Sequence, residues 1–260
     1  MIIAIANPKG GVGKSTTAAA LSVGLRRRGV RILAVDLDPQ GSLTSWLGVR
    51  PAEAQRRPGM VQLLMDEVAA ERAVTDTPAG VPIIAATPTL QVVEEALRAR
   101  PNREGQVYRA LEPIVPTYDV VVVDTPASVG LWLWSALAMM DRLLAPVETE
   151  AAAIDGVARL IRELDDVRRY GLNERAALDG VVLTKYDRRR GTDKRAVELI
   201  RQGLGDVVMD TVIPTDVRLV EVAETLDVSL WDGESPGAVA YRALTQEVVD
   251  RWLSDGMILA

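Results

Sequence analysis

Short apolar runs alternate with longer amphipathic segments along most of this chain. The runs are uniformly apolar, a pattern typical of strands that are buried on both faces of a parallel sheet. We expect strands at residues 2–6, 31–37, 81–87, 118–124, 141–147, 179–187 and 207–214. The segments between them carry apolar residues at helical spacing, and we expect helices at residues 14–29, 90–99, 156–171, 193–205 and 238–253.

This alternation predicts a doubly wound α/β fold, in which helices cover both faces of a mostly parallel sheet. Neither a Gly/Ser-rich or Pro-rich linker nor an internal repeat divides the sequence, so we expect one domain over residues 1–260. The least regular part is residues 49–82. There we expect a surface excursion with one helix at residues 61–70.

The composition removes several kinds of chemistry. The 260 residues include no cysteine and no histidine, which excludes disulfides, cysteine-ligated metals, iron–sulfur clusters and the commonest general base. Catalysis would then depend on Lys, Asp, Glu, Ser, Thr, backbone amides or a metal with oxygen ligands. Since no charged leader precedes an apolar segment and no run approaches the roughly 20 apolar residues that span a bilayer, we expect a cytoplasmic protein.

A glycine-rich loop separates the first expected strand from the first expected helix. Its sequence is NPKGGVGKSTTA, from Asn7 to Ala18. The GKS triplet fits the usual phosphate-loop pattern, although Pro8 stands where that pattern opens with glycine. In such loops the backbone amides turn toward phosphate oxygens, the lysine bridges the terminal phosphates and the hydroxyl ligates Mg²⁺. The predicted nucleotide-binding residues are Gly10, Gly11, Val12, Gly13, Lys14, Ser15 and Thr16.

A second lysine, Lys9, precedes the glycines. Two ammonium groups so close together require dense negative charge, which a triphosphate supplies. The stretch KGGVGKST resembles the deviant Walker A motif of the ParA/Soj partition ATPases and their relatives, the Min-system division-site ATPase among them. The resemblance implies a P-loop NTPase fold, ATP and Mg²⁺ as cofactors, and a homodimer that forms on ATP binding. It makes Lys9, reaching across to the partner's nucleotide, and Lys14 catalytic candidates.

Two aspartates follow the second expected strand. Asp36 and Asp38 lie at its carboxyl end, where doubly wound sheets bind ligands, and residues two apart on a strand point the same way. The stretch DLDPQG resembles the family's VDLDPQGN segment, in which the second aspartate positions the attacking water. The resemblance makes Asp38 the hydrolytic residue and Asp36 a magnesium-side or structural partner.

Asp124 ends another buried run, YDVVVVDTPASVG. A hydrophobic strand that delivers one carboxylate to Mg²⁺, usually through water, is the Walker B pattern. With Ser15, Asp124 forms the predicted magnesium site. The family typically has DTPPS or DCPPS here, and Ala127 replaces the second proline. This replacement affects the rigidity of the loop but leaves its chemistry unchanged. We expect slow turnover, because Asp38 would orient water without a strong base.

The identity of the base is open. Residues 184–187 read TKYD and fit the [NT]KxD pattern of many GTPases, whereas the partition ATPases often have LTMYD, which points to adenine. Residues 212–224 resemble the family's IPRNVRLSEAPS loop, which closes over the base, although Thr215 replaces its arginine. The other motifs favour ATP, and Lys185 keeps GTP possible. Candidate residues on this side are Thr184, Lys185 and Pro214.

The formal net charge is −6, yet basic residues cluster at 26–31, 98–103 and 188–195. Residues 185–201 carry seven basic and three acidic side chains. Such a run is more often a solvated face, but it can give salt-sensitive, sequence-independent binding to phosphates. The family resemblance implies nonspecific double-stranded DNA, with Arg189 and Arg218 at matching positions. Chosen on charge alone are Arg188, Arg190, Lys194 and Arg195.

The resemblance implies a nucleoid-associated ATPase that partitions a chromosome or plasmid, stimulated by a ParB-like centromere-binding partner. A relative that positions other cargo on the nucleoid would use the same residues. A Min-type membrane ATPase would need a basic amphipathic C-terminal helix, whereas residues 240–260 are mixed in charge, so we expect no membrane partner. The absence of cysteine excludes the nitrogenase iron protein, and no second substrate motif indicates an amidase-coupled ligase.

Overall fold

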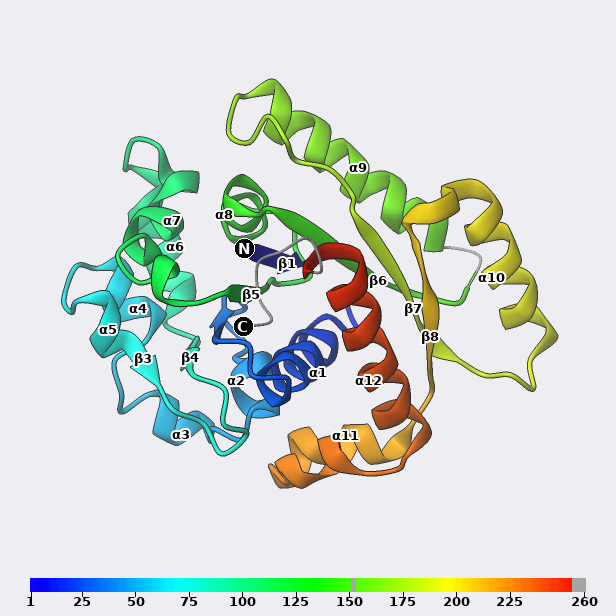
Figure 1. The fold of residues 1–260 in the computed structure, drawn as a ribbon. Helices are drawn as coiled ribbons and strands as arrows, with labels where there is room; N and C mark the ends of the chain where they lie inside the picture. The colour runs from blue at the N-terminus through cyan, green and yellow to red at the C-terminus, as the bar shows by residue number, and fades with distance from the viewer. Residues whose placement is uncertain (151–152, 254–260) are drawn as a thin grey trace.

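The computed structural model describes residues 1–150 and 153–253. They form one eight-stranded sheet with helices packed against it (Figure 1). The strand order is β3-β4-β2-β5-β1-β6-β7-β8, and every pairing is parallel except that of β3 with β4. The strands are β1 (Ile2–Ile5), β2 (Ile32–Asp36), β3 (Val74–Thr75), β4 (Ile83–Ile84), β5 (Val120–Asp124), β6 (Arg142–Glu148), β7 (Gly180–Tyr186) and β8 (Val208–Pro214). The doubly wound α/β prediction is confirmed.

Helices cover both faces of this sheet (Figure 1). One face packs against α1 (Lys14–Arg27), α2 (Ser42–Trp46), α11 (Val217–Thr225) and α12 (Pro236–Val248). The other face packs against α4 (Met60–Leu64), α5 (Ala70–Ala73), α6 (Leu90–Arg98), α7 (Gln106–Leu111), α8 (Leu131–Met139), α9 (Ala153–Arg169) and α10 (Gly191–Leu204). A short α3 (Pro51–Ala54) lies in the surface excursion, and a π-helical turn, Val249–Leu253, follows α12.

The two faces explain the uniformly apolar strands. Ile3 and Ile5 of β1 belong to the core beneath α1 and α12, whereas Ile2 and Ala4 belong to the core beneath α8 and α9. Because successive side chains of a strand point to opposite faces, a strand with a core on each side needs apolar residues throughout.

Residues 49–82 differ from the expectation of one helix at residues 61–70. The structure has three short helices there, α3, α4 and α5, followed by β3. The chain turns at Asp66, whose φ of 59° is left-handed, and the amide of Glu67 donates to the carbonyl of Gln62. A left-handed residue cannot continue a right-handed helix, so α4 ends before it.

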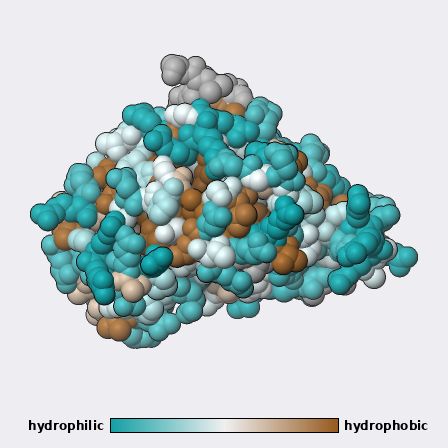
Figure 2. All heavy atoms as spheres, turned by 90° about the horizontal axis from the view of Figure 1, so that it is seen from below, coloured by the Kyte–Doolittle hydropathy of each residue, from teal (hydrophilic) through white to brown (hydrophobic). Residues whose placement is uncertain are grey.

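Helix α8 was not anticipated, because its sequence LWLWSALAM has no polar face. A helix that is buried nearly all round shows no amphipathic period. Figure 2 shows a face on which hydrophilic side chains dominate and apolar atoms form separate patches. Within the part of the chain that the structure describes, none of the helices combines the length and apolar character needed to cross a bilayer. Part of the expected mixed-charge C-terminal segment, residues 254–260, lies outside the described residues.

Candidate nucleotide site

The sheet order brings three separate sequence motifs to one edge. Strands β2, β5 and β1 are neighbours, and Asp124 lies in register with Asp36 on one side and with Ile5 on the other. The glycine loop begins at Asn7, two residues after β1 ends at Ile5. The carboxyl ends of parallel strands meet at a single edge, so the two carboxylates and the loop predicted from the sequence are brought together.

The loop requires glycine at two positions. Gly11 and Gly13 have φ values of 75° and 89°, which other residues rarely adopt. Helix α1 begins directly after Gly13, whose carbonyl accepts the first helical bond, from the amide of Thr17. The backbone amides at the start of α1 thus face the position where phosphates bind in loops of this type.

Side chains from elsewhere fix the loop. The Asn7 amide donates to the carbonyl of Pro146 at 2.8 Å, and its oxygen accepts from the amide of Lys9 at 2.9 Å. The Thr184 hydroxyl donates to the carbonyl of Val12 at 2.9 Å. Asn7 was missed by the sequence analysis, although its place between strand and loop was a signal. The predicted base-side residue Thr184 lies against the loop itself.

Lys14 is the buried cation of the site. Its ammonium group donates to the carbonyl of Lys9 at 3.0 Å, and the residue is 6% exposed. Burial lowers the pKa of Lys14, while the nearby carboxylates of Asp124 and Asp38 act in the opposite direction. A phosphate would stabilise this buried ammonium group strongly, because its negative charge compensates for the hydration that the group loses on burial.

Asp124 is fully buried, and neither of its carboxylate oxygens has a hydrogen-bond partner among the described residues. Burial raises its pKa well above the ordinary value, and the nearby Asp36 adds to this, whereas Ser15 and Lys14 oppose it. A buried carboxylate without donors is costly unless a cation compensates. A magnesium ion is usually held by one or two carboxylates with substrate phosphates. Asp124 and the Ser15 hydroxyl therefore fit Mg²⁺.

Asp36 is held differently. One of its oxygens accepts from the amide of Asp38 at 3.0 Å, and the other accepts from the amide and hydroxyl of Thr44 at 2.9 and 2.8 Å. Burial raises the pKa of Asp36 to about 7, against the effect of these bonds. Since protein donors occupy both oxygens, the contacts favour the structural alternative for Asp36. Its magnesium role stays a prediction.

Asp38 lies beyond the strand, which ends at Asp36. The rule that strand residues two apart point the same way therefore does not apply to this pair. One carboxylate oxygen of Asp38 accepts from the amide of Gln40 at 2.9 Å, and the residue is half-buried, whereas Asp36 is fully buried. Asp38 is thus the aspartate of the pair that a water molecule can reach.

Lys9 is bound by two carboxylates that the sequence analysis did not identify. Its ammonium group forms an ion pair with Glu148 at 3.2 Å and another with Glu150. Glu148 also pairs with Lys185, at 2.5 Å. Glu148 is the last residue of β6, and a charged residue at the carboxyl end of a buried strand was the signal that could have found it.

The base-side candidates lie on neighbouring strands. Tyr186 of β7 is in register with Pro214 of β8, and the amide of Thr215 donates to the carbonyl of Tyr186 at 3.1 Å. The aspartate of the TKYD motif, Asp187, accepts from Arg189 through both carboxylate oxygens, which lowers the pKa of Asp187 to about 2. An aspartate engaged in this way is poorly available to read guanine.

The basic candidates for DNA contact follow β7 and β8. Exposed residues there are Arg188, Arg189, Arg190, Lys194, Arg195 and Arg218. Arg189 and Arg190 pair with Asp187. In the other two basic clusters, ion pairs hold Arg27 to Asp232, Arg31 to Asp119, Arg98 to Glu95 and Arg103 to Glu104. The cluster after β7 therefore has more cations without a carboxylate partner.

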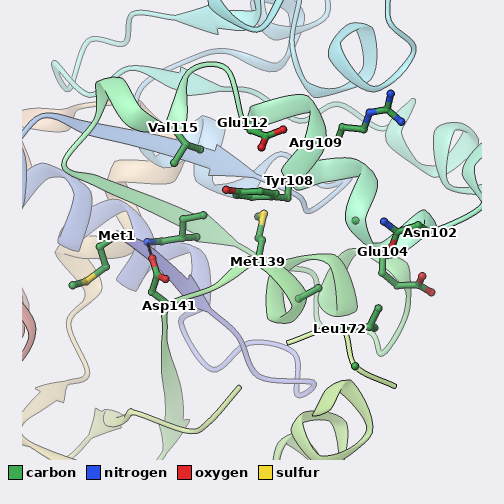
Figure 3. A pocket seen from close by; sticks show the side chains of 14 residues that line it. Met1, Asn102, Glu104, Tyr108, Arg109, Glu112, Val115, Met139, Asp141 and Leu172 are labelled. Atoms are coloured by element: carbon green, nitrogen blue, oxygen red, sulfur yellow. Dashed lines mark hydrogen bonds between the residues drawn. The ribbon is translucent and has the colours of Figure 1, made fainter. Parts of the chain in front are cut away.

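A cavity of about 550 Å³ lies at the opposite end of β1 (Figure 3). Its lining includes Met1, Tyr108, Glu112, Met139 and Asp141. Since the phosphate loop follows the other end of β1, this cavity is separate from the predicted site and contains none of its residues.

Comparisons with known proteins agree with this geometry. Residues 1–178 match the family model described as an AAA domain. The chain is 37% identical over 254 residues to the chromosome partitioning protein ParA of Caulobacter vibrioides, covering 96% of this chain and 94% of that protein. It is 39% identical over 250 residues to the chromosome-partitioning ATPase Soj of Thermus thermophilus, covering 96% and 95%.

Among solved structures, a similar one is the cobyrinic acid a,c-diamide synthase of Mycobacterium smegmatis with a bound ATP analogue and magnesium. It is 30% identical with a TM-score of 0.83, and the match covers 98% of this chain and 97% of that one. The fold, the phosphate loop and the carboxylate edge are thus those of a nucleotide-binding protein.

Proposed function

The chain belongs to the ParA/Soj family of partition ATPases, and we propose that it acts as a DNA partition ATPase that binds nonspecific duplex DNA as an ATP-dependent homodimer. As a member of this family, it is an ATPase that uses ATP with Mg²⁺. The observation that carries the proposal is the meeting of the glycine loop, Lys14 and the unpartnered Asp124 at one sheet edge, next to a basic cluster.

Each residue of the site has a distinct part in hydrolysis. The loop amides and Lys14 would hold the phosphates, and Ser15 and Asp124 would hold Mg²⁺, which would neutralise charge on the phosphate oxygens. Asp38, half-buried and beyond the strand, orients the attacking water by accepting a hydrogen bond from it. Alignment without a strong base gives slow turnover.

Lys9 is the residue through which we expect one subunit of the homodimer to act on the other. In the structure its ammonium group is held by Glu148 and Glu150, both partly exposed. Ion pairs of this kind contribute only about 0–1 kcal/mol, so a nearby triphosphate can displace them. We propose that Lys9 then serves the nucleotide of the partner subunit, and that a ParB-like partner stimulates hydrolysis of this dimer.

Three variants test the proposed roles in nucleotide binding, dimerisation and hydrolysis. Lys14→Ala is expected to abolish nucleotide binding. Lys9→Ala is expected to spare binding but weaken dimerisation or hydrolysis, and Asp38→Ala to accumulate an ATP-bound dimer on DNA. Analytical sedimentation with ATP, with and without duplex, measures all three. A Lys9→Ala variant that sediments and hydrolyses like the unmodified chain would contradict the trans role.

The DNA surface is tested separately. Replacing both Arg189 and Arg218 with alanine is expected to reduce duplex affinity and the salt dependence of binding, while ATP affinity stays unchanged. Replacing Arg98 and Arg103 instead is the matched control, because it removes the same charge from a different basic cluster, outside residues 185–201. Equal losses in the two double variants would place the DNA surface elsewhere.

Two other functions remain to be separated from partition. A cargo-positioning ATPase on the nucleoid would share every property above and differ only in the partner that stimulates it. The similarity to a cobyrinic acid a,c-diamide synthase favours a second candidate, an ATP-dependent amide-forming enzyme. ATP hydrolysis that responds to cobyrinic acid with glutamine, and not to DNA, would support that candidate over partition.

A further inference from the structure

Three of the four lysines of the chain surround the phosphate loop. Lys9 and Lys14 belong to the loop, Lys185 reaches it from β7, and Lys194 lies exposed on α10. All other basic side chains are arginine. A lysine ammonium group is a compact point charge, well suited to a phosphate oxygen. The third ammonium group is not explained by the hydrolytic mechanism above.

The backbone places Lys185 over the loop. Its ammonium nitrogen lies 3.8 Å from the position that a Cβ on Gly11 would take. Lys185 has a φ of 55°, a left-handed conformation that lysine rarely adopts. The preceding residue, Thr184, is anchored to the carbonyl of Val12. Strained conformations of this kind concentrate at functional sites, where the surrounding contacts maintain them.

Glu148 connects Lys185 with Lys9. Its carboxylate lies 2.5 Å from the Lys185 nitrogen and 3.2 Å from the Lys9 nitrogen. Burial of Glu148 acts to raise its pKa, but the bonds from Lys185 and Lys9 outweigh this and lower it. One carboxylate therefore balances two ammonium groups at the mouth of the loop.

All three ammonium groups bond to oxygens of the protein itself. Lys14 donates to the carbonyl of Lys9, Lys9 pairs with both glutamates, and Lys185 pairs with Glu148. The terminal phosphates of a nucleotide carry more negative charge than one carboxylate and offer more oxygens, so they compete for the same donors. A cavity of about 920 Å³, lined by Glu148, Lys185 and the start of α10, gives the displaced carboxylate room to move.

We propose that Lys185 contacts the terminal phosphates of ATP and selects the triphosphate over the diphosphate, with Glu148 as the counterion that ATP displaces. Lys185 and Lys9 pair with the same carboxylate, that of Glu148. Lys9 lies at the start of the loop, away from the first turn of α1. Its charge therefore acts on the phosphate end of the nucleotide rather than on the base. The proposal depends on ATP binding at the loop and is independent of DNA binding.

The test measures affinity for two probes, the non-hydrolysable analogue adenylyl-imidodiphosphate and ADP, by isothermal titration calorimetry with Mg²⁺. The variants are Lys185→Met, Lys185→Arg and Glu148→Gln. The matched control is Arg175→Met, which removes one exposed cation from the segment before the other end of β7. Circular dichroism establishes that each variant is folded.

Lys185→Met is expected to weaken binding of the triphosphate analogue about five-fold and of ADP less than about two-fold, the size of effect given by a partly exposed ion pair. Lys185→Arg is expected to retain most of the preference for the triphosphate analogue over ADP, because it keeps the positive charge. Glu148→Gln is expected to strengthen binding of the triphosphate analogue. Both effects shrink at high salt. If Lys185→Met fails to fold, the opposite sign expected for Glu148→Gln still tests the proposal.

Two results would overturn the proposal. Equal losses for the triphosphate analogue and ADP in Lys185→Met would place Lys185 at the base or ribose, and a Glu148→Gln variant with weaker triphosphate binding would exclude competition. A failure here is distinct from a failure of the partition function. Selectivity that depends on Lys185, in a chain that never binds DNA, would refute only the partition function.

Discussion

Replacing Gly24 with alanine is expected to disturb the contact between α1, which carries Lys14 and Ser15, and α12. A Cβ on Gly24 would lie 2.9 Å from Cγ2 and 3.0 Å from Cβ of Thr245, and closer still to its hydroxyl oxygen. Thr245 is fully buried, and its hydroxyl donates to the carbonyl of Tyr241 at 2.9 Å. The side chain therefore cannot turn away without losing that bond.

Two effects of this change oppose each other. Alanine stabilises a helix interior by about 1 kcal/mol over glycine. Overpacking a core contact costs about 1–3 kcal/mol, and contact distances this short favour the upper end. We therefore expect the free energy of unfolding to fall by about 2 kcal/mol, which lowers the melting temperature by about 4–8 °C in a domain of this size.

Thermal and urea unfolding measure this effect, with Gly203→Ala as the control. Gly203 is also helical, in α10, and a Cβ there would meet nothing within 4 Å, so that variant should gain stability. Adding Thr245→Ala to Gly24→Ala should recover part of the loss, because the colliding atoms are removed. A Gly24→Ala variant as stable as Gly203→Ala would refute the packing argument.

Three further predictions concern buried polar groups of the site and its helix. In EDTA, Asp124→Asn should raise the free energy of unfolding by about 1 kcal/mol or more, because burial disfavours the charged form of Asp124. It should lower Mg²⁺-dependent hydrolysis at least about ten-fold, and unchanged hydrolysis would exclude its magnesium role. Because folding raises the pKa of Asp36 from 3.8 to about 7, the folded state holds its proton more tightly, so the free energy of unfolding in EDTA should fall as pH rises across that interval. Asp36→Asn should flatten this slope, and an equal slope would exclude Asp36 as its source. Thr17 and Tyr241 share a buried 3.2 Å hydroxyl bond, so Thr17→Val and Tyr241→Phe should each cost about 1–2 kcal/mol and the double variant less than their sum; strict additivity in urea unfolding would show that the bond contributes nothing.

The sequence was sufficient for the parts of the fold that local patterns determine. Uniformly apolar runs located the seven parallel strands, and the glycines located the loop, because a buried strand and a left-handed turn each restrict residue type. β3 was missed because its two residues, Val74–Thr75, lie in the polar stretch ERAVTDTP, which contains no apolar run. The expected helix at residues 61–70 failed because Asp66 takes a left-handed turn that its neighbours do not signal.

Within the site, the sequence found groups that chemistry requires at fixed spacing and missed those joined by tertiary contact. Lys14, Ser15 and Asp124 follow from the motif and the strand end. Glu148 could not be assigned, because its role depends on two lysines from distant segments meeting one carboxylate. The roles of Asp38 and Lys9 rest on the resemblance and stay predictions.

That the chain forms one domain over residues 1–260 also stays a prediction. Limited proteolysis with ATP and Mg²⁺ tests it. A single protected fragment is the expected result, and two separately protected fragments would contradict it.

The most direct measurement is binding of a random-sequence duplex at low and moderate salt, without nucleotide and with ADP, ATP or GTP. We predict binding that appears with ATP alone and weakens steeply as salt rises, because salt ions replace the arginine and lysine contacts to phosphates. Binding that is equal in all four nucleotide conditions, or none in any of them, would contradict the proposal of an ATP-switched partition protein.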